Sequence, residues 1–135
     1  MLLACDVGTV RIGIARSDAS QMLAVPLDSV AAGDAAISQI LALINEYSVV
    51  EIIVGLPLKM DGTEGPSAQM ARSWTVELVE QTDVPVRLVD ERLTTVQAQR
   101  GLHAAGRTVK NSRSSIDSAS AVVLLQSVLD SKASR

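Results

Sequence analysis

The first eighteen residues, MLLACDVGTVRIGIARSD (1–18), decide the fold. An apolar run, Met1–Asp6, ends in an acid, and the turn residues V-G-T follow it at positions 7–9. Val10–Arg16 then alternates between apolar and other residues, which is the period of a β-strand. A third strand is expected within Leu23–Val30, shortened by Pro26. The pattern predicts an antiparallel meander of three strands.

Helix and strand patterns alternate after the meander. Apolar residues recur at helical spacing over Asp34–Tyr47 and over Ser67–Gln81. Two short apolar runs, Val49–Val54 and Val84–Val89, are typical of strands that are covered on both faces. Gly55–Pro66 contains three glycines and two prolines, so it is expected to be a loop.

The C-terminal part of the chain is mainly helical in pattern. A helix over Thr94–Ala105 begins with a capping box, a basic loop covers Gly106–Arg113, and a last helix covers Ser114–Leu129. Only Ser131–Arg135 is expected to fray. The whole order predicts an α/β fold, a five-stranded mixed sheet flanked by helices, in one domain spanning residues 1–135.

Composition excludes several classes of protein. The 135 residues are 47% hydrophobic and 20% charged, which argues against intrinsic disorder. Aromatic residues make up only 1%, so modules that stack bases on aromatic side chains are nearly excluded. One Cys and one His cannot form an internal disulfide or a thiolate zinc site. Any metal ion would therefore be held by oxygen ligands, which points to Mg²⁺, Mn²⁺ or Ca²⁺.

The sequence gives no sign of a membrane protein. No apolar run reaches the roughly 18 residues that a spanning helix needs. The N-terminal MLLACD has no basic region and reaches an acid too early for a signal peptide. We therefore expect a cytoplasmic protein without a membrane segment.

Charge is distributed unevenly. The net charge is −3, but residues 1–86 hold eleven acidic and four basic side chains, and six of the twelve bases lie between Arg87 and Arg113. Two interpretations stay open: a solvated helix face with a loop, or a strip that contacts phosphates. The candidate nucleic-acid contacts are Thr9, Arg11, Lys59, Arg92, Arg100, Arg107, Lys110 and Arg113.

Four acidic residues stand where strands end or a helix begins. Asp6 ends the first strand, Asp90 and Glu91 end the fifth, and Asp117 lies in the first turn of the last helix. If the first and fifth strands are parallel, their carboxyl ends share one edge of the sheet, where ligand sites occur. Clustered carboxylates repel unless a divalent cation neutralises them. Mg²⁺ or Mn²⁺ suits such oxygen ligands, and a pair of such ions is suited to phosphodiester cleavage.

Each acid also has a purely structural interpretation. Asp6 can serve as a turn acid before Gly8, and Asp117 can complete a capping box with Ser114. Glu91 can pair with a neighbouring arginine on the surface. The catalytic interpretation therefore depends on the acids meeting in one place.

Other residues have expected roles by their type. Gly8 and Gly13 lack side chains and would let the backbone approach a metal ion or a phosphate closely. The loop Lys59–Gly65 is either a mobile flap over a substrate or an ordinary connection. Cys5 is expected in the core, and His103 on a helix face with no catalytic role assigned.

Four blocks of the sequence, in order, resemble the YqgF (RuvX) family. They are DVGTVRIGIARSD (6–18), VGLPLKMDG (54–62), VDERLTT (89–95) and IDSASA (116–121), the last followed by VVLLQ. The first block alone is only moderately specific, because its D-x-G-T pattern also occurs in actin-like ATPases, whereas the third and fourth blocks together are strongly specific. Two residues depart from the family pattern: Ser120, in a stripe expected in the core, where Ala is more frequent, and Trp74, where Phe is expected.

The resemblance implies an RNase H-like fold, with three antiparallel strands and two more parallel to the first. It implies a metal-dependent nuclease that matures the 5′ end of pre-16S rRNA, or else a Holliday junction resolvase acting on branched DNA. It assigns Asp6, Glu91 and Asp117 as catalytic and metal-binding acids, with Mg²⁺ or Mn²⁺ as cofactor and Asp90 as a weaker, supporting candidate.

The sequence is also compatible with two functions other than a nuclease, and within the nuclease interpretation with two substrates. The D-V-G-T at 6–9 also suits a nucleotide-binding module of the actin and sugar-kinase type, but such enzymes need roughly twice this length. A non-catalytic scaffold suits the uneven charge but leaves the clustered acids unexplained. A resolvase must cut two strands symmetrically, which favours a homodimer. The low overall charge favours structured RNA over tight DNA binding.

Overall fold

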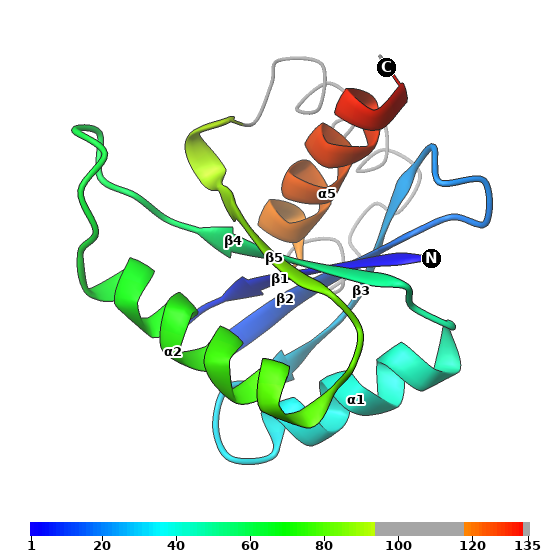
Figure 1. The fold of residues 1–135 in the computed structure, drawn as a ribbon, viewed down its shortest axis with the longest axis horizontal. Coiled ribbons are helices and arrows are strands. Elements are labelled where there is room, and N and C mark those ends of the chain that lie inside the picture. Colours follow the sequence, from blue (N-terminus) through cyan, green and yellow to red (C-terminus); the bar gives the residue numbers. More distant parts are fainter. Residues whose placement is uncertain (94–117, 134–135) are drawn as a thin grey trace.

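The computed structural model describes residues 1–93 and 118–133. Figure 1 shows the helices and strands along the chain. They are β1 (Leu2–Val7), β2 (Arg11–Ser17), β3 (Ala24–Ala31), α1 (Ala36–Glu46), β4 (Glu51–Leu56), α2 (Pro66–Gln81), β5 (Val86–Asp90), the short 3₁₀ helix η1 (Glu91–Leu93) and α5 (Ala119–Ala133).

The strands of the described part form one five-stranded sheet in the order β3-β2-β1-β4-β5 (Figure 1). β1, β2 and β3 pair antiparallel, whereas β4 is parallel to β1 and β5 is parallel to β4. The predicted mixed sheet and its strand directions are confirmed. Because β1, β4 and β5 run the same way, their carboxyl ends lie at one edge of the sheet.

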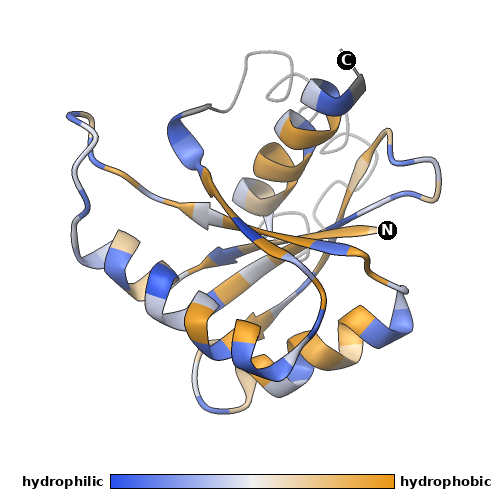
Figure 2. Cartoon of the chain, viewed as in Figure 1, coloured by the Kyte–Doolittle hydropathy of each residue, from blue (hydrophilic) through white to orange (hydrophobic). Residues whose placement is uncertain are grey.

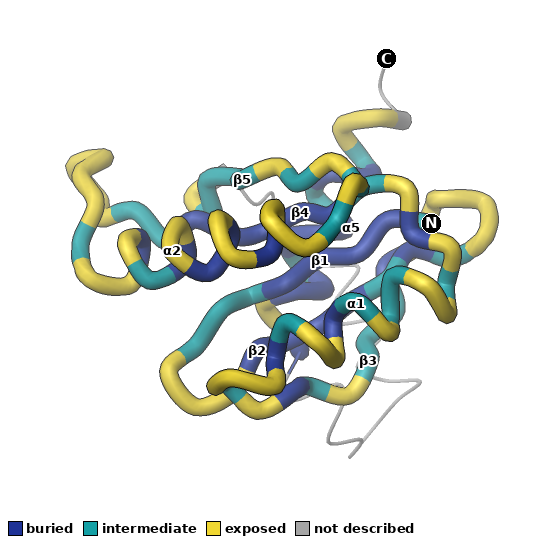
Figure 3. Tube along the Cα trace, turned by 60° about the horizontal axis from the view of Figure 1, so that its bottom comes forward, coloured by how far each residue is buried: buried dark blue, intermediate teal, exposed yellow. Residues whose placement is uncertain are grey.

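Helices cover both faces of the sheet. α1 and α2 pack on one face and α5 packs on the other (Figure 1). β1 serves both layers, because Leu3 and Cys5 belong to the α1–α2 core while Leu2 and Ala4 belong to the α5 core. A strand buried on both faces needs a continuous apolar run, which explains the sequence of β1 and β4. Figures 2 and 3 show the hydrophobic and buried positions concentrated on these central strands.

Three expectations about strands were wrong. The strand expected over Val84–Val89 is β5 (Val86–Asp90), an edge strand without a fully buried residue, so it is not fully covered on both faces. β3 runs for eight residues through Pro26 and is not shortened by it, because an edge strand needs ladder hydrogen bonds on one side only. β4 continues through Gly55 to Leu56, which the glycine and proline content had assigned to a loop. Leu56 pairs with Asp90, so the ladder between β4 and β5 extends to the end of β5.

The last helix differs from its prediction at both its surface and its end. α5 continues to Ala133, so the fraying expected from Ser131 is wrong up to that residue. Ser120 is exposed rather than in the core, which is formed by other positions such as Leu125 and Leu129. The predicted helix and basic loop over 94–113 lie outside the described residues. None of the described helices is long and apolar enough to cross a membrane.

Candidate active site

The carboxyl edge of the sheet brings Asp6 and Glu91 together. Asp6 lies near the end of β1, and Glu91 is the first residue after β5. Because β4 lies between these two strands, the Glu91 side chain reaches across β4 to meet Asp6. The two carboxyl groups share a hydrogen bond. Two of the three predicted acids therefore occupy one place, although 85 positions separate them in the chain.

Gly55 makes this meeting possible. It is a buried residue of β4, paired with Val89 of β5. A methyl group at Gly55 would clash with the Oε1 of Glu91 and lie 3.1 Å from its Cδ and Cγ. The Glu91 side chain therefore lies directly over the Gly55 backbone. The sequence analysis missed this residue, although a glycine directly after a β-branched run is a signal of close approach.

The two neighbouring carboxyl groups cannot both be ionised without an electrostatic cost. Burial, the hydrogen bond with Asp6 and the negative charges of Asp6 and Asp90 raise the pKa of Glu91 to about 7. Such a pair requires a proton or a positive ion between its oxygens. Carboxylate oxygens are the ligands that Mg²⁺ and Mn²⁺ prefer, so the two residues fit a divalent cation.

The described residues supply only part of a metal site. No group of three or more His, Cys, Asp or Glu side chains that could hold a metal ion occurs within residues 1–93 and 118–133. The third predicted ligand, Asp117, lies outside the described residues. The structure thus accounts for two oxygen-bearing side chains and leaves the third as a prediction.

Asp90 faces a different partner from its neighbour Glu91. The Arg92 guanidinium donates to both Asp90 carboxylate oxygens, from Nε at 3.2 and 3.1 Å and from Nη2 at 2.8 Å. The Arg92 backbone N–H also donates to Asp90 Oδ1 at 2.9 Å. These hydrogen bonds hold the pKa of Asp90 below its usual value. Asp90 therefore lies beside the acid pair as an ionised carboxylate whose charge is balanced by the Arg92 guanidinium.

The loop after β4 is folded as a small hairpin. Leu58 and Glu64 form an isolated β-bridge, the Lys59 N–H donates to Thr63 O at 2.9 Å, and the Gly62 N–H donates to Lys59 O at 2.8 Å. Gly62 has a φ of +87°, which a side chain would disfavour. The segment expected as either a flap or a simple connection is thus a hydrogen-bonded hairpin. Lys59 is exposed on it, as a nucleic-acid contact requires.

The turn between β1 and β2 lies just beyond Asp6. The Gly8 N–H donates to Arg11 O at 3.0 Å, and a Cβ on Gly8 would lie only 2.6 Å from that oxygen. Gly8 is therefore required by the turn itself. Thr9 and Arg11 are exposed there, and Gly13 pairs with Asp6 across the β1–β2 ladder. Contacts of these residues with a phosphate or a metal ion stay predictions.

A buried hydroxyl attaches the start of α5 to the sheet near this edge. The β2–β3 ladder has an irregularity between Ile12 and Ile14, where β3 contains one extra residue. Ser118 fills this break: its Oγ accepts from the Ile14 N–H at 3.0 Å and donates to Leu27 O at 2.8 Å. The sequence predicts no role for Ser118, because this residue falls inside the helix expected over Ser114–Leu129 and its partners on β2 and β3 are distant in the chain.

Several residues singled out from the sequence lie outside the described residues, and one lies in the core, apart from the site. Arg100, His103, Arg107, Lys110 and Arg113 lie outside the described residues. Cys5 is buried in the core as expected, where burial and the charge of Asp6 raise the pKa of its thiol to about 12.

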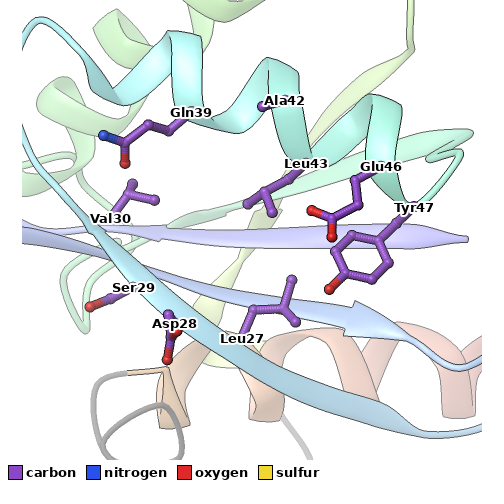
Figure 4. A pocket seen from close by; sticks show the side chains of 9 residues that line it. All are labelled: Leu27, Asp28, Ser29, Val30, Gln39, Ala42, Leu43, Glu46 and Tyr47. Atoms are coloured by element: carbon purple, nitrogen blue, oxygen red, sulfur yellow. The ribbon is translucent and has the colours of Figure 1, made fainter.

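A cavity of about 490 Å³ lies between β3 and α1 (Figure 4). Its lining includes Leu27 and Val30 of β3, with Leu43, Glu46 and Tyr47 at the end of α1. None of the predicted site residues lines it. It is separate from the Asp6–Glu91 pair.

Comparison with known proteins agrees with this geometry. A model of the family described as "RuvX: Holliday junction resolvase" matches residues 1–131. A protein of Streptomyces coelicolor named "Putative pre-16S rRNA nuclease" is 47% identical over 133 residues, which cover 96% of this chain and 80% of that protein. A protein of the same name from Kineococcus radiotolerans is 46% identical over 134 residues, covering 96% of this chain and 71% of the relative.

Solved structures share the fold. RuvC from T. thermophilus in complex with a Holliday junction substrate superposes with a TM-score of 0.66 at 9% identity, covering 99% of this chain and 97% of that chain. A second Thermus thermophilus RuvC structure gives 0.64 at 12% identity, with 98% and 96% covered. At this identity the likeness concerns the fold, and the expected RNase H-like architecture is confirmed.

Proposed function

Because the chain belongs to the RuvX family, we propose that it is a nuclease that hydrolyses phosphodiester bonds and matures the 5′ end of pre-16S rRNA. The observation that carries the proposal is the Asp6–Glu91 pair held over Gly55 at the carboxyl edge of the sheet. The proposed substrate is taken from the names of the relatives, and the proposed hydrolysis from the acid pair.

We assign the binding of Mg²⁺ or Mn²⁺ to Asp6 and Glu91, with Asp117 as the third ligand. A divalent cation held by these residues would supply Lewis acidity for activating a water molecule and for neutralising charge on the phosphate. The chain itself contributes the two carboxylates, fixed by β1 and by the turn after β5. Asp90, occupied by Arg92, adds negative charge beside the pair without being a ligand.

The position of Ser118 supports the assignment of Asp117. The Ser118 hydroxyl hydrogen-bonds the Ile14 N–H, one residue from Gly13, which is the ladder partner of Asp6. Asp117 is covalently joined to Ser118, and consecutive Cα atoms lie about 3.8 Å apart. The start of the last helix is therefore attached to the sheet close to the strand that carries Asp6.

The nucleic-acid substrate would lie against the exposed residues around this edge. Lys59 on the hairpin, Thr9 in the β1–β2 turn and Arg11 at the start of β2 are exposed, and the turn and the hairpin follow the carboxyl ends of β1 and β4. The basic residues between 100 and 113 remain proposed phosphate contacts. The substrate class predicts a reaction in the cytoplasm, where bacterial rRNA is processed.

A Holliday junction is the second candidate substrate, because the matching family carries that description. Symmetric cutting of two strands calls for a two-fold dimer, so this candidate predicts a homodimer with two acid pairs. The actin and sugar-kinase alternative is tested by calorimetry with ATP and Mg²⁺, in which a nuclease gives no specific heat of nucleotide binding.

Matched substrates test the proposal. Purified protein is incubated with an RNA carrying the pre-16S 5′ extension and with a four-way DNA junction, in Mg²⁺ or Mn²⁺, and the products are mapped. We expect RNA cleavage that disappears in Asp6→Asn while the circular dichroism spectrum is unchanged. Cleavage of the junction alone would favour the second candidate, and full activity of Asp6→Asn would refute both.

A further inference from the structure

We propose that Arg92 is a positioning residue that joins the hairpin of residues 58–64 to the end of β5 and thereby fixes Glu91 over Gly55. This inference rests on the proposed function, because it concerns the same acid pair. It differs from the role that the sequence suggested for Arg92, which was a direct contact with a substrate phosphate.

The contacts of Arg92 reach in two directions. On one side Nε and Nη2 bind the Asp90 carboxylate at 2.8–3.2 Å. On the other side Nη1 donates to Met60 O at 3.3 Å, and the guanidinium lies 3.7–3.8 Å from the Cβ position of Gly62. One side chain therefore connects β5 with the tip of the hairpin.

Glu91 lies in the chain between Asp90 and Arg92, the two residues of this ion pair. It begins η1, a 3₁₀ turn of only three residues, and such a turn has little stability of its own. Its side chain points across β4 to Asp6, whereas Asp90 and Arg92 bind each other. Fixing the residues before and after Glu91 fixes the backbone from which its carboxylate projects.

A phosphate contact fits the observed geometry less well. The planar guanidinium already forms a two-pronged pair with Asp90, the geometry in which Arg is most selective. A phosphate bound in the same two-pronged way through Nε and Nη2 would have to displace that carboxylate. The pair is also partly shielded, since the side chains of Arg92 and Asp90 are 39% and 20% exposed.

The two roles differ in what they predict for Arg92→Lys: a positioning role makes it behave like Arg92→Ala, whereas a phosphate contact makes it behave like the wild-type protein. A lysine preserves a point charge for phosphate but not the two-pronged pair. If Arg92 positions Glu91, both variants weaken Mn²⁺ binding measured by calorimetry about 10- to 100-fold, as removal of supporting partners does at metal sites. They also lower kcat, and the salt dependence of RNA binding keeps its slope.

Hydrogen exchange gives a readout that needs neither metal nor substrate. The amides of Lys59 and Gly62 are bonded within the hairpin, so both variants should exchange them faster than the wild-type protein does. Asp90→Asn should also speed the exchange of these amides. The double variant Asp90→Asn with Arg92→Ala should exchange them no faster than either single variant, because each single change already breaks the same ion pair.

Arg87→Ala is the matched control. Arg87 lies near the start of β5, the strand that Asp90 ends, and pairs with Glu51 at 3.3 Å, so it is at the opposite end of the strand from the Asp90–Arg92 pair. It should leave Mn²⁺ affinity and hairpin exchange unchanged. The inference is overturned if Arg92→Lys behaves as wild type while Arg92→Ala lowers the salt slope by about 0.7 to 0.9. It is also overturned if hairpin exchange is unaffected, or if Arg87→Ala has an equal effect.

The test also separates this inference from the proposed function. If the wild-type protein neither binds Mn²⁺ nor cleaves RNA, the nuclease proposal fails, yet hairpin exchange still reports whether Arg92 holds the loop. If the wild-type protein is active and the Arg92 variants keep normal Mn²⁺ affinity, only the positioning role fails.

Discussion

The two ends of the parallel strands treat negative charge in opposite ways. At the amino end, Glu51 opens β4 and has Arg87 at 3.3 Å and Lys132 at 3.6 Å from its Oε1. At the carboxyl end, Glu91 lies against Asp6 and near Asp90, and the adjacent Arg92 is bound to Asp90 instead. At the amino end basic side chains neutralise Glu51, whereas at the carboxyl end acidic side chains lie close together.

The difference separates a surface charge pair from a functional site. Exposed ion pairs such as Arg87–Glu51 contribute about 0–1 kcal/mol and can be lost without much effect. Acids kept together in a partly buried place destabilise the protein unless a ligand cation compensates. The arrangement at the carboxyl end therefore fits the proposed cation site better than a stabilising ion pair. Changes at the two ends should have different consequences.

The largest expected effect comes from removing one acid of the pair. Asp6→Asn should lower cleavage about 10³-fold, because several kcal/mol of stabilisation by the bound cation are lost. Glu51→Gln, the matched change at the amino end, should stay within about threefold of wild type. Single-turnover cleavage of the pre-16S RNA substrate measures both, and equal losses in the two variants would erase the distinction between the ends.

Filling the space above Gly55 should be the next largest effect. Gly55→Ala places a methyl group where the Glu91 carboxylate lies, so Glu91 must move away from Asp6. We expect Mn²⁺ affinity to fall about 10- to 100-fold by calorimetry, the loss expected when a ligand is displaced. Ile53→Val, two residues earlier in β4, should cost about 0.5–1.5 kcal/mol of stability but keep the affinity. Unchanged Mn²⁺ binding in Gly55→Ala would contradict the site.

Removing the Ser118 hydroxyl should affect folding and cleavage together. Ser118→Ala leaves the Ile14 N–H and the Leu27 carbonyl without this buried partner, at a cost of about 1–3 kcal/mol. Urea unfolding measures the free energy, and the same preparation is tested for cleavage. Ser120→Ala, an exposed change on the same helix, should alter stability by less than about 0.5 kcal/mol. If Ser118→Ala is as stable as the wild-type protein but inactive, Ser118 does not act by attaching the start of α5 to the sheet.

The smallest expected effect is a pH dependence of stability without metal. The pKa of Glu91 is raised to about 7 in the folded protein, so the folded state holds this proton more tightly than the unfolded state does. The associated stability is complete below the ordinary pKa of about 4.5 and is lost as the pH rises through 7. With chelator present, the Tm of wild type should fall more between pH 6 and 8 than that of Glu91→Gln. Glu51→Gln should follow wild type, and parallel curves for all three would refute the buried acid pair.

Most of the fold follows from residues whose pattern is local. The continuous apolar run of β1 predicts a strand buried on both faces, and Leu2, Leu3, Ala4 and Cys5 divide between the two cores. Bounds failed where pairing partners decide them. Pro26 sits inside β3 because of its edge position, and Leu56 belongs to β4 because it pairs with Asp90. Neither fact is visible in the local sequence.

The site could be predicted only in part, for the same physical reason. Asp6 and Glu91 are recognisable because acids at strand ends are chemically conspicuous. Gly55, Ser118 and Arg92 act through contacts with chain segments that are distant in sequence or folded back toward the site. The local pattern therefore predicts only a loop for Gly55 and a phosphate contact for Arg92, and it predicts no separate role for Ser118. Tertiary geometry, not sequence spacing, gives them their roles.

Paramagnetic NMR with Mn²⁺ tests the central claim most directly. Mn²⁺ is titrated into ¹⁵N-labelled protein, and line broadening of backbone amide signals is followed at both ends of the sheet. We predict that the amides of Asp6, Gly55 and Glu91 broaden at the lowest Mn²⁺ concentrations, and that those of Glu51 and Arg87, about 13 Å farther along the strands, broaden less at every concentration. Equal broadening at both ends, or unchanged signals at Asp6 and Glu91, would contradict a cation site built on these two acids.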